Sequence, residues 1–443
     1  MTECITQLAF LGILKTQVVA DFSGGNLTSD AGVLFVREVD DRLELTARLA
    51  RHFLDRRDPA KVRHQAHEQF RQRIYQICCG YEDCNDADTL RSDPALKIAC
   101  GREPETGANL ASQPTLSRFE NAAGEEAIKR MNRELLETYV KTRKRPGERI
   151  VIDVDSTDDP THGQQEFSFF HGFYNQHMFH PLLCYDGETG DLLAANLRPG
   201  NVHSANGVVK MLKRVVKKIR KRFFGASIVI RGDAGFCVPR LYRFCERWGL
   251  GYVLGLITNA TLKKLHAPLL ARAEAMYEED KTKVRLLGEV GYKAKTWDRF
   301  RRVIMKAEAM PQGTNRRFVV TNLDGAPVEI YDFYTMRGDV ENRIKELKNA
   351  LAADRLSCCR FEANRFRLLL HCAAYVLMHH LRRRLAGTEL ETAQFDTIRL
   401  RLLKVGARVR QTVRRVWVHV ASSYPYKHLW QTLHGRLMDP APS

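Results

Sequence analysis

Short β-branched runs alternate with an amphipathic segment in the middle of the chain. The runs at residues 149–154 and 226–231 are rich in valine and isoleucine, and the run at 252–257 is mostly aliphatic, as buried strands are. Residues 208–223 place lysines on one side of a predicted helix and apolar residues on the other. Strand, helix and strand in succession are typical of an α/β core. We therefore predict an α/β fold whose core begins at residues 148–257.

The hydrophobic pattern outside this stretch predicts further segments. Helical periodicity before residue 145 predicts a small helical domain, which either binds a DNA end or packs as a cap on the core. A basic linker with proline and glycine follows it. The predicted domains are a helical N-terminal domain at 1–145, the first part of the core at 148–257, a β-rich insertion at 258–325, the second part of the core at 326–390, and a basic C-terminal hairpin and tail at 391–443. For that hairpin, DNA contact and a plain sheet with one solvated face are both open.

Charge and cysteine content narrow the class of protein. The 70 lysines and arginines exceed the 52 acidic residues, which gives a formal charge of +18. Such an excess favours a polyanionic partner, above all nucleic acid, although solubility alone can also account for it. Eleven scattered cysteines without a signal-like N-terminus predict a reducing, cytoplasmic setting. No apolar run approaches the roughly 18 residues that a bilayer span requires, so we expect no membrane partner.

One predicted helix, at residues 334–348, carries an unusual face. Tyr334, Arg337, Glu341 and Lys348 are separated by three, four and seven positions. At about 100° per residue, all four fall within one stripe roughly 100° wide. One carboxylate therefore shares a helix face with two cations and a phenol.

Other carboxylates stand at the ends of predicted strands. Asp153 and Asp155 lie two apart and share a strand face, and Asp233 follows the next strand. We prefer Asp155 as a ligand because the chain leaves the sheet there, with Asp153 as the alternative or supporting residue. Any one of these acids, taken singly, could be an ordinary turn or cap residue. Together with Glu341 they predict a site on two strands and a helix.

Carboxylates gathered in this way are suited to phosphodiester chemistry. Two metal ions about 3.5–4 Å apart can stabilise both the attacking and the leaving oxygen. Hard oxygen ligands favour Mg²⁺, with Mn²⁺ able to substitute. The lysine stripe of residues 208–223, which includes Lys213 and Lys217, is either a DNA backbone contact or a solvated face.

Several motifs carry a family resemblance. The order Asp155, Asp233, Glu341 with the Tyr-Arg-Glu-Lys spacing resembles the DDE transposases of bacterial insertion sequences. The stretches VIDVDST, HGFYNQHMFHPLL, RGDAGF and VGARVRQTVRRV with SSYP are similar to the insertion-sequence family thirteen-eighty.

The resemblance implies an RNase H-like catalytic core interrupted by a β-rich insertion, and cut-and-paste transposition in a bacterial, nucleoid-associated setting. It implies that Asp155, Asp233 and Glu341 hold Mg²⁺. Its implied partners are double-stranded DNA, as terminal inverted repeats and target, and a second copy of the chain in a homodimer on DNA. The implied DNA contacts are Tyr334, Arg337 and Lys348 at phosphates, and Trp297 as an aromatic platform, unless Trp297 is simply a core residue.

Two other functions remain compatible with the sequence. The first is an RNase H-like, Mg²⁺-dependent, structure-specific nuclease such as a junction resolvase. The second is a catalytically silent DNA-binding derivative, against which the intact acids argue.

Overall fold

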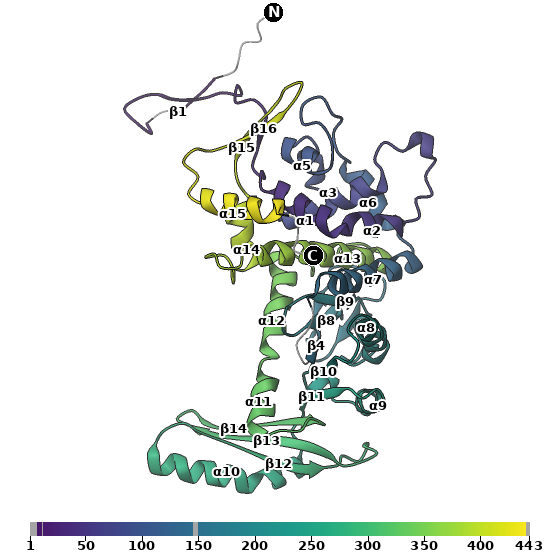
Figure 1. Cartoon of the computed structure of the whole chain (residues 1–443), viewed down its shortest axis with the longest axis vertical. Helices are drawn as coiled ribbons and strands as arrows, with labels where there is room; N and C mark the ends of the chain where they lie inside the picture. Colours follow the sequence, from purple (N-terminus) through teal and green to yellow (C-terminus); the bar gives the residue numbers. More distant parts are fainter. Residues whose placement is uncertain (1–6, 11, 145–148, 440–443) are drawn as a thin grey trace, which may run out of the picture. The chain divides into compact units, whose positions relative to one another are not determined.

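The chain is a mixed α/β protein with one large sheet. The computed structural model describes residues 7–10, 12–144 and 149–439. These residues form two compact units (Figure 1). The first unit comprises residues 1–123, 350–352 and 373–443, and the second comprises residues 124–349 and 353–372. The predicted basic linker at 141–147 lies partly outside the described residues.

The first unit is mainly helical. Its short strand β3 pairs with β15, and β15 pairs with β16 as an antiparallel hairpin. Helix α6 begins after Ser112 with Pro114 in its first turn, where the missing N–H of proline does no harm. Its elements are β1 (Leu8–Phe10), β2 (Val18–Ala20), β3 (Leu27–Thr28), α1 (Val33–Leu43), α2 (Leu45–Arg51), α3 (Ala66–Cys78), α4 (Ala87–Leu90), α5 (Pro94–Ala99), α6 (Gln113–Ala122), α14 (Phe395–Ile398), β15 (Ala407–Gln411), β16 (Val416–Val420) and α15 (Lys427–Met438).

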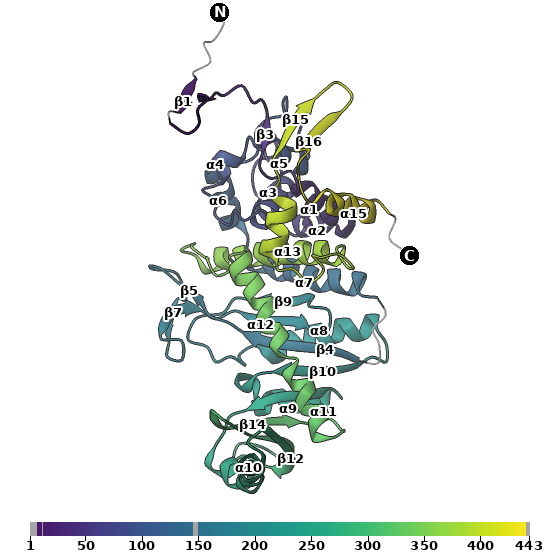
Figure 2. The same ribbon diagram turned by 90° about the vertical axis from the view of Figure 1, so that its left-hand side faces the viewer.

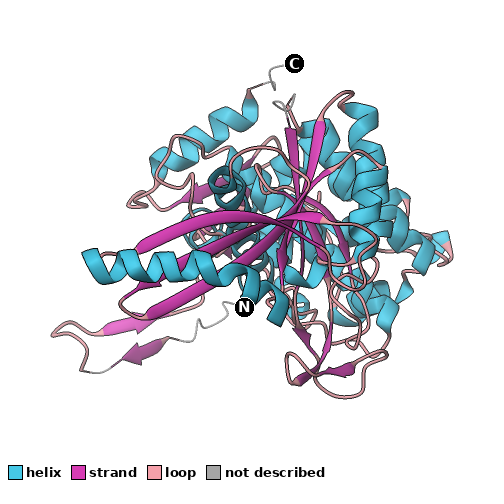
Figure 3. Cartoon of the chain, turned by 90° about the horizontal axis from the view of Figure 1, so that it is seen from below, coloured by secondary structure: helices cyan, strands magenta, loops and turns pink. Residues whose placement is uncertain are grey.

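The second unit is built on an eight-stranded sheet in the order β12-β13-β14-β11-β10-β4-β8-β9. Strand β4 is parallel to β10 and antiparallel to β8. Figure 3 shows the long strands crossing at an angle, as the twist of a large sheet requires. The strands are β4 (Arg149–Ser156), β8 (Leu182–Asp186), β9 (Leu192–Asn196), β10 (Ser227–Gly232), β11 (Gly251–Leu256), β12 (Val284–Tyr292), β13 (Arg301–Met310) and β14 (Gly313–Thr321).

Helices cover both faces of this sheet, which explains why most side chains of its central strands are apolar and buried. One face packs against α7 (Glu125–Thr142), α8 (Val208–Arg222) and α9 (Pro239–Arg247) in a single core cluster. The other packs against α11 (Pro327–Thr335) through Ile330, Tyr331 and Phe333. Figure 2 shows α11 and α12 (Gly338–Lys345) crossing in front of the strands.

Two predicted helical or strand segments differ from the structure. The helix predicted at 334–348 is interrupted at Met336 and Arg337, between α11 and α12, and ends in a π-helical turn at Glu346–Ala350. Gly338 directly follows the interruption, where a glycine weakens helix formation. Residues 395–403, predicted as part of a hairpin, are instead helical, and the hairpin itself begins at Ala407.

The segment between β11 and β12 contains a long helix that the sequence pattern did not predict. This helix, α10 (Ala260–Asp280), begins where the Asn259 side chain accepts a hydrogen bond from the backbone N–H of Leu262. Only Leu262, His266 and Ala273 are buried, so its apolar stripe is narrow. Residues 293–297, inside the predicted β-rich insertion, form a turn after β12.

The remaining elements of this unit are a small three-stranded sheet and the first half of a long helix, whose residues from 373 onward belong to the first unit. The sheet has the order β5-β7-β6. These elements are β5 (Asp159–Pro160), β6 (Phe169–His171), β7 (Gln176–Phe179) and α13 (Phe361–Arg383).

Candidate active site

Two of the predicted acids stand at the same edge of the central sheet. Asp155 is the penultimate residue of β4, and Asp233 directly follows β10. These strands are parallel neighbours, so their carboxyl ends meet at one edge. Asp155 is 8% exposed, and the Oδ1 atom of Asp233 accepts a hydrogen bond of 2.9 Å from the backbone N–H of Gly235. This bond holds Asp233 at the start of the turn that follows its strand.

Arg337 joins two of the acids. Its Nη1 atom lies 3.2 Å from Oδ2 of Asp155, and its Nη2 atom lies 2.8 Å from Oε1 of Glu341. Glu341 is one helical turn beyond Arg337 and has a half-exposed side chain. The guanidinium therefore bridges a strand carboxylate and a helix carboxylate that are far apart in sequence.

Asp233 and Glu341 also act electrostatically on Asp155. The pKa of Asp155 is raised to about 7, chiefly by burial and also by the negative charges of Asp233 and Glu341, while the positive charge of Arg337 limits the rise. A buried carboxylate beside two others requires compensating positive charge. Within residues 7–10, 12–144 and 149–439, no group of three His, Cys, Asp or Glu side chains is arranged to hold a metal ion. Carboxylate oxygens are nevertheless the hard ligands that a divalent cation prefers. Metal binding by these acids stays a prediction.

Tyr334 lies against the backbone that carries Asp233. A Cβ atom added to Gly255 of β11 would lie 2.7 Å from the Tyr334 hydroxyl oxygen and 2.9 Å from the backbone nitrogen of Ala234. Glycine at position 255 thus allows the phenol to approach the turn after β10. The structure accordingly brings Tyr334 and Arg337 together with the acids.

We expect Gly255→Ala to destabilise the second unit by about 1–3 kcal/mol, because the added methyl group displaces both the phenol and the Ala234 backbone. Urea unfolding measures the change. Gly291→Ala in β12 is the matched control, since no atom lies within 4 Å of the added methyl group there. Equal stability of the two variants would contradict this close packing.

Lys348 lies apart from the Arg337 bridge. Its Nζ atom is 2.8 Å from Oδ1 of Asp158, whose Oδ2 atom accepts a bond of 3.0 Å from Nε2 of Gln176. The π-helical turn at Glu346–Ala350 turns Lys348 away from the ideal stripe, because a π turn contains more residues than an α turn. Asp158 and Gln176 were not predicted as site residues, although Asp158 lies only three positions after Asp155.

Asp153 lies behind the site. Both of its carboxylate oxygens accept bonds of 2.7 Å from Arg231, and each side chain is 1% exposed. Arg231 also donates through Nη1 to the backbone carbonyl of Phe333 at 2.9 Å. The pair thus links β4, β10 and α11, the elements that carry or precede the candidate residues. Arg231 too was missed, because its partner lies on a neighbouring strand.

The remaining candidates are separate from the acids. Trp297 is 5% exposed and packs at 5.2 and 5.4 Å, between ring centroids, from Tyr242 and Tyr292. It therefore has the core position that the sequence also allowed. Lys213 and Lys217 lie on the exposed face of α8.

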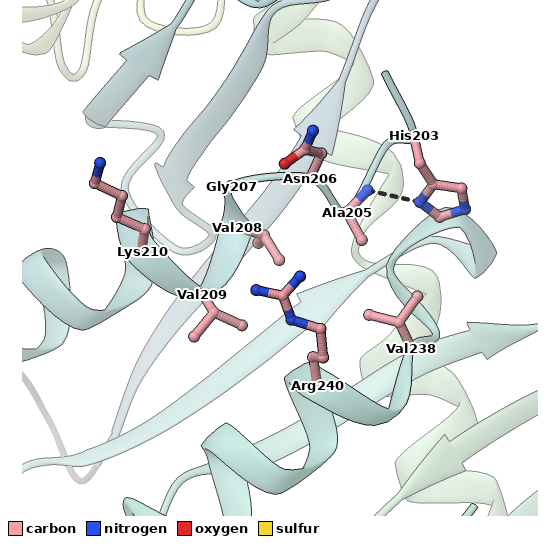
Figure 4. Close-up of a pocket in the computed structure, with 9 residues that line it drawn as sticks. All are labelled: His203, Ala205, Asn206, Gly207, Val208, Val209, Lys210, Val238 and Arg240. Carbon is pink, nitrogen blue, oxygen red and sulfur yellow. Dashed lines mark hydrogen bonds between the residues drawn. The ribbon is translucent and has the colours of Figure 1, made fainter. Parts of the chain in front are cut away.

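A pocket of about 530 Å³ lies at the start of α8 (Figure 4). The side chains of His203, Lys210 and Arg240 contribute to its lining, together with Val208 and Val238. No aspartate or glutamate is among its lining residues. The pocket therefore continues the basic character of α8 rather than that of the acidic cluster.

Buried His180 gives this unit a pH dependence. Burial lowers the pKa of His180 to about 4, while its Nδ1 atom lies 2.9 Å from the carbonyl of Val202. The unfolded chain, with a histidine pKa of about 6.5, binds the proton more tightly. Stability is therefore full above about pH 6.5 and falls by up to about 3 kcal/mol as the pH drops to about 4.

Urea unfolding across that pH range tests this expectation. His180→Gln should remove most of the slope, because glutamine does not titrate and can still donate to Val202. The exposed His203→Gln is the control and should keep it. An unchanged slope in His180→Gln would assign the pH dependence to another group.

The chain is similar to a known family over nearly its whole length. The model of a family described as transposase DDE domain group 1 matches residues 12–441. No curated protein matches the chain. Among solved structures, a cryo-EM structure of the piggyBac transposase synaptic complex with hairpin DNA is similar at a TM-score of 0.46 and 9% identity, covering 94% of this chain and 83% of that one. The family match spans both compact units.

Proposed function

The chain belongs to the family of transposases with a group 1 DDE domain, and we propose on that basis that it cuts and joins the ends of its own insertion sequence by a cut-and-paste route. The observation that carries this proposal is the position of Asp155 and Asp233 at the carboxyl ends of two parallel strands, together with the Arg337 bridge that joins Asp155 to Glu341 of α12. We further assign the chain to the insertion-sequence family thirteen-eighty of bacteria.

In this proposal the three acids hold divalent metal, with Mg²⁺ as the natural ion. The metal would supply Lewis-acid stabilisation of the attacking and leaving oxygens of the phosphodiester. Asp155 and Asp233 provide ligands fixed on strands, and Glu341 provides one on a helix that is more exposed to solvent. We leave Asp153 out of the ligand set, since Arg231 occupies both of its oxygens.

Binding of the DNA ends falls to the cations around the acids. Arg337, once released from the carboxylates, is placed to donate two N–H groups to a phosphate. Tyr334 and Lys348 add a hydroxyl and an ammonium group on either side. Lys213 and Lys217 of α8 extend the basic surface, consistent with the net charge of +18. We expect two copies of the chain to hold two ends in a synaptic homodimer.

The strand order supports an RNase H-like core. Taken in chain order, β4, β8, β9, β10 and β11 are its first to fifth strands, and they lie in the order third, second, first, fourth, fifth. Of these five, the second alone runs antiparallel to both of its neighbours. We therefore propose that residues 148–257 and 326–390 form this core, that 258–325 is an insertion, and that 1–145 and 391–443 serve DNA binding.

A cleavage assay tests the proposed function. The substrate is a duplex carrying the inverted repeats that flank the gene, with Mg²⁺, and with a scrambled repeat as control. We expect nicks at the repeat end and, with added target DNA, joined products. Cutting of branched junctions without any preference for the repeats would support a structure-specific nuclease instead, and binding without cutting would support a silent derivative.

A further inference from the structure

The hairpin of the first unit, formed by β15 and β16, has two unlike faces. Arg408 stands opposite His419 and Arg410 stands opposite Trp417, so all four side chains lie on one face. Both arginines and His419 are exposed, and Trp417 is 46% exposed. The other face is apolar and more buried, and it comprises Ala407, Val409, Val418 and Val420. The exposed face of the hairpin is therefore cationic and aromatic.

The positive charge of this face is not balanced by acids. No aspartate or glutamate lies between Asp396 and Asp439 in the sequence. The ion pairs described for this region involve Arg399, Lys404 and His428 and leave out Arg408, Arg410, Arg414 and Arg415. Glu105 does reach the hairpin, but its Oε1 atom accepts a bond of 2.9 Å from the backbone N–H of Gln411. Like charges gathered on one face repel one another, so a polyanionic partner would stabilise this arrangement.

The side chains along β16 are stacked in a row. The guanidinium carbon of Arg415 lies 5.8 Å from the centre of the Trp417 ring, and the Trp417 and His419 rings lie 5.9 Å apart with their planes 5° from parallel. Thr412 closes the turn before this row, since its Oγ1 atom accepts a bond of 3.1 Å from the N–H of Arg415 and its own N–H donates to the Arg415 carbonyl at 2.8 Å. Stacking and the closed turn fix the position of Arg415 before any partner binds, which lowers the entropic cost of binding.

The hairpin is a supported two-stranded ribbon of limited width. Figure 1 shows β15 and β16 extending past the helices of the first unit. On its other edge β15 pairs with β3, and the N–H of Val409 donates to the carbonyl of Asn26 at 2.8 Å. Five residues at about 3.4 Å each give a strand about 17 Å long. The major groove of B-form DNA, about 12 Å wide, admits a two-stranded ribbon, whereas the minor groove, about 6 Å wide, is too narrow.

We propose that the exposed face of the β15–β16 hairpin binds in the major groove of the duplex terminal repeat. This inference rests on the proposed function and names the element that recognises the repeat. Arg408 and Arg410, in the middle of the face, would donate to the N7 and O6 atoms of guanine, which arginine binds with two N–H groups. Arg414 and Arg415, at the tip, would bind phosphates and fix the register of the ribbon on the DNA.

Binding and protection measurements on the full chain test the ribbon. The probe is a duplex carrying the repeat that flanks the gene, with a scrambled duplex for comparison. The wild-type chain should protect guanine N7 atoms of the repeat from methylation by dimethyl sulfate. The double variant Arg408→Ala with Arg410→Ala should lose this protection and about tenfold or more of the preference for the repeat. The double variant Arg414→Ala with Arg415→Ala should weaken binding to both duplexes, and the slope of log affinity against log salt should fall by about 2.

The controls separate this proposal from its alternatives. Arg51→Ala with Arg56→Ala removes the same charge from two other exposed positions of the first unit and should keep both the protection and the preference. An equal loss in that control would assign the effect to total charge and overturn the ribbon. Guanine protection that persists without Arg408 and Arg410 would overturn it as well.

Two further outcomes distinguish the ribbon from the other parts of the proposed function. Asp233→Asn should keep the guanine protection, because binding through the hairpin needs no cleavage. A wild-type chain that protects the repeat without cutting it would refute the cleavage function and leave the ribbon intact. A shift from dimer to monomer in the variant lacking Arg408 and Arg410, with DNA binding unchanged, would overturn the ribbon in favour of a contact between two copies of the chain.

Discussion

Asp233→Asn should lower strand cleavage by about three orders of magnitude or more, because bound metal supplies several kcal/mol of transition-state stabilisation and each 1.36 kcal/mol is a factor of ten. Asparagine keeps the size of the side chain, and its carbonyl oxygen can still accept the bond from Gly235. The change therefore removes a negative charge and leaves the turn intact. Binding of the repeat duplex should not weaken, since the substitution removes a group that repels phosphate.

Two further substitutions test whether the loss of strand cleavage comes from the three candidate acids. Glu341→Gln should lose cleavage to a similar extent. Asp339→Asn is the matched control, because Asp339 is an exposed carboxylate on the same helix and lies outside the bridge that Arg337 makes to Asp155 and Glu341. Cleavage by either Asp233→Asn or Glu341→Gln at the wild-type rate would remove the basis of the proposed chemistry. Gel analysis of nicked repeat duplex at saturating Mg²⁺ gives the rates.

The central strands could be predicted from the sequence because helices bury both of their faces. Strands β4 and β10 and the amphipathic α8 lie within two residues of the predicted ranges. Their signal is local, since a run of valine and isoleucine or a lysine stripe is visible without knowing the fold. The pairing of β14 with β11, which joins the insertion to the same sheet, is not local and was not predicted.

The predictions from sequence failed where tertiary contacts, rather than the local residue pattern, determine the structure. Helix α10 has few buried positions, so its apolar period is weak, although Asn259 offered a cap signal. The sequence does not predict the interruption of the helix at Met336 and Arg337, because Tyr334, Arg337 and Glu341 are spaced as they would be in a continuous helix. Arg337 lies one helical turn before Glu341, but its other partner, Asp155, is 182 positions away in sequence.

The candidate acids can be picked out in the sequence, whereas their contacts cannot. Asp155, Asp233 and Glu341 were singled out because each ends an apolar run or interrupts a cationic face. Lys348 pairs with Asp158 from a π-helical turn, and no pattern in the sequence predicts that turn. Asp153 is a second example. Its spacing of two residues from Asp155 predicts that both acids share one strand face, but the sequence does not show that Asp153 pairs with Arg231.

Arg231→Met should destabilise the second unit by about 3–5 kcal/mol, because it leaves the buried carboxylate of Asp153 without its ion pair. Asp153→Asn should cost a similar amount, since it leaves a guanidinium buried at 1% exposure. The double variant Asp153→Leu with Arg231→Met should recover part of the loss, because the unpaired charge disappears. Urea unfolding measures all three.

A surface pair supplies the comparison for this buried one. Arg285 and Asp332 lie 2.6 Å apart with side chains that are 36% and 51% exposed, so Asp332→Ala should cost at most about 1 kcal/mol. The buried pair should also matter beyond stability, since Arg231 holds β4, β10 and the carbonyl of Phe333 next to Tyr334. Cleavage by the refolded double variant should therefore fall even at temperatures where it is fully folded. If its cleavage equals that of wild type, the pair stabilises the sheet without positioning the acids.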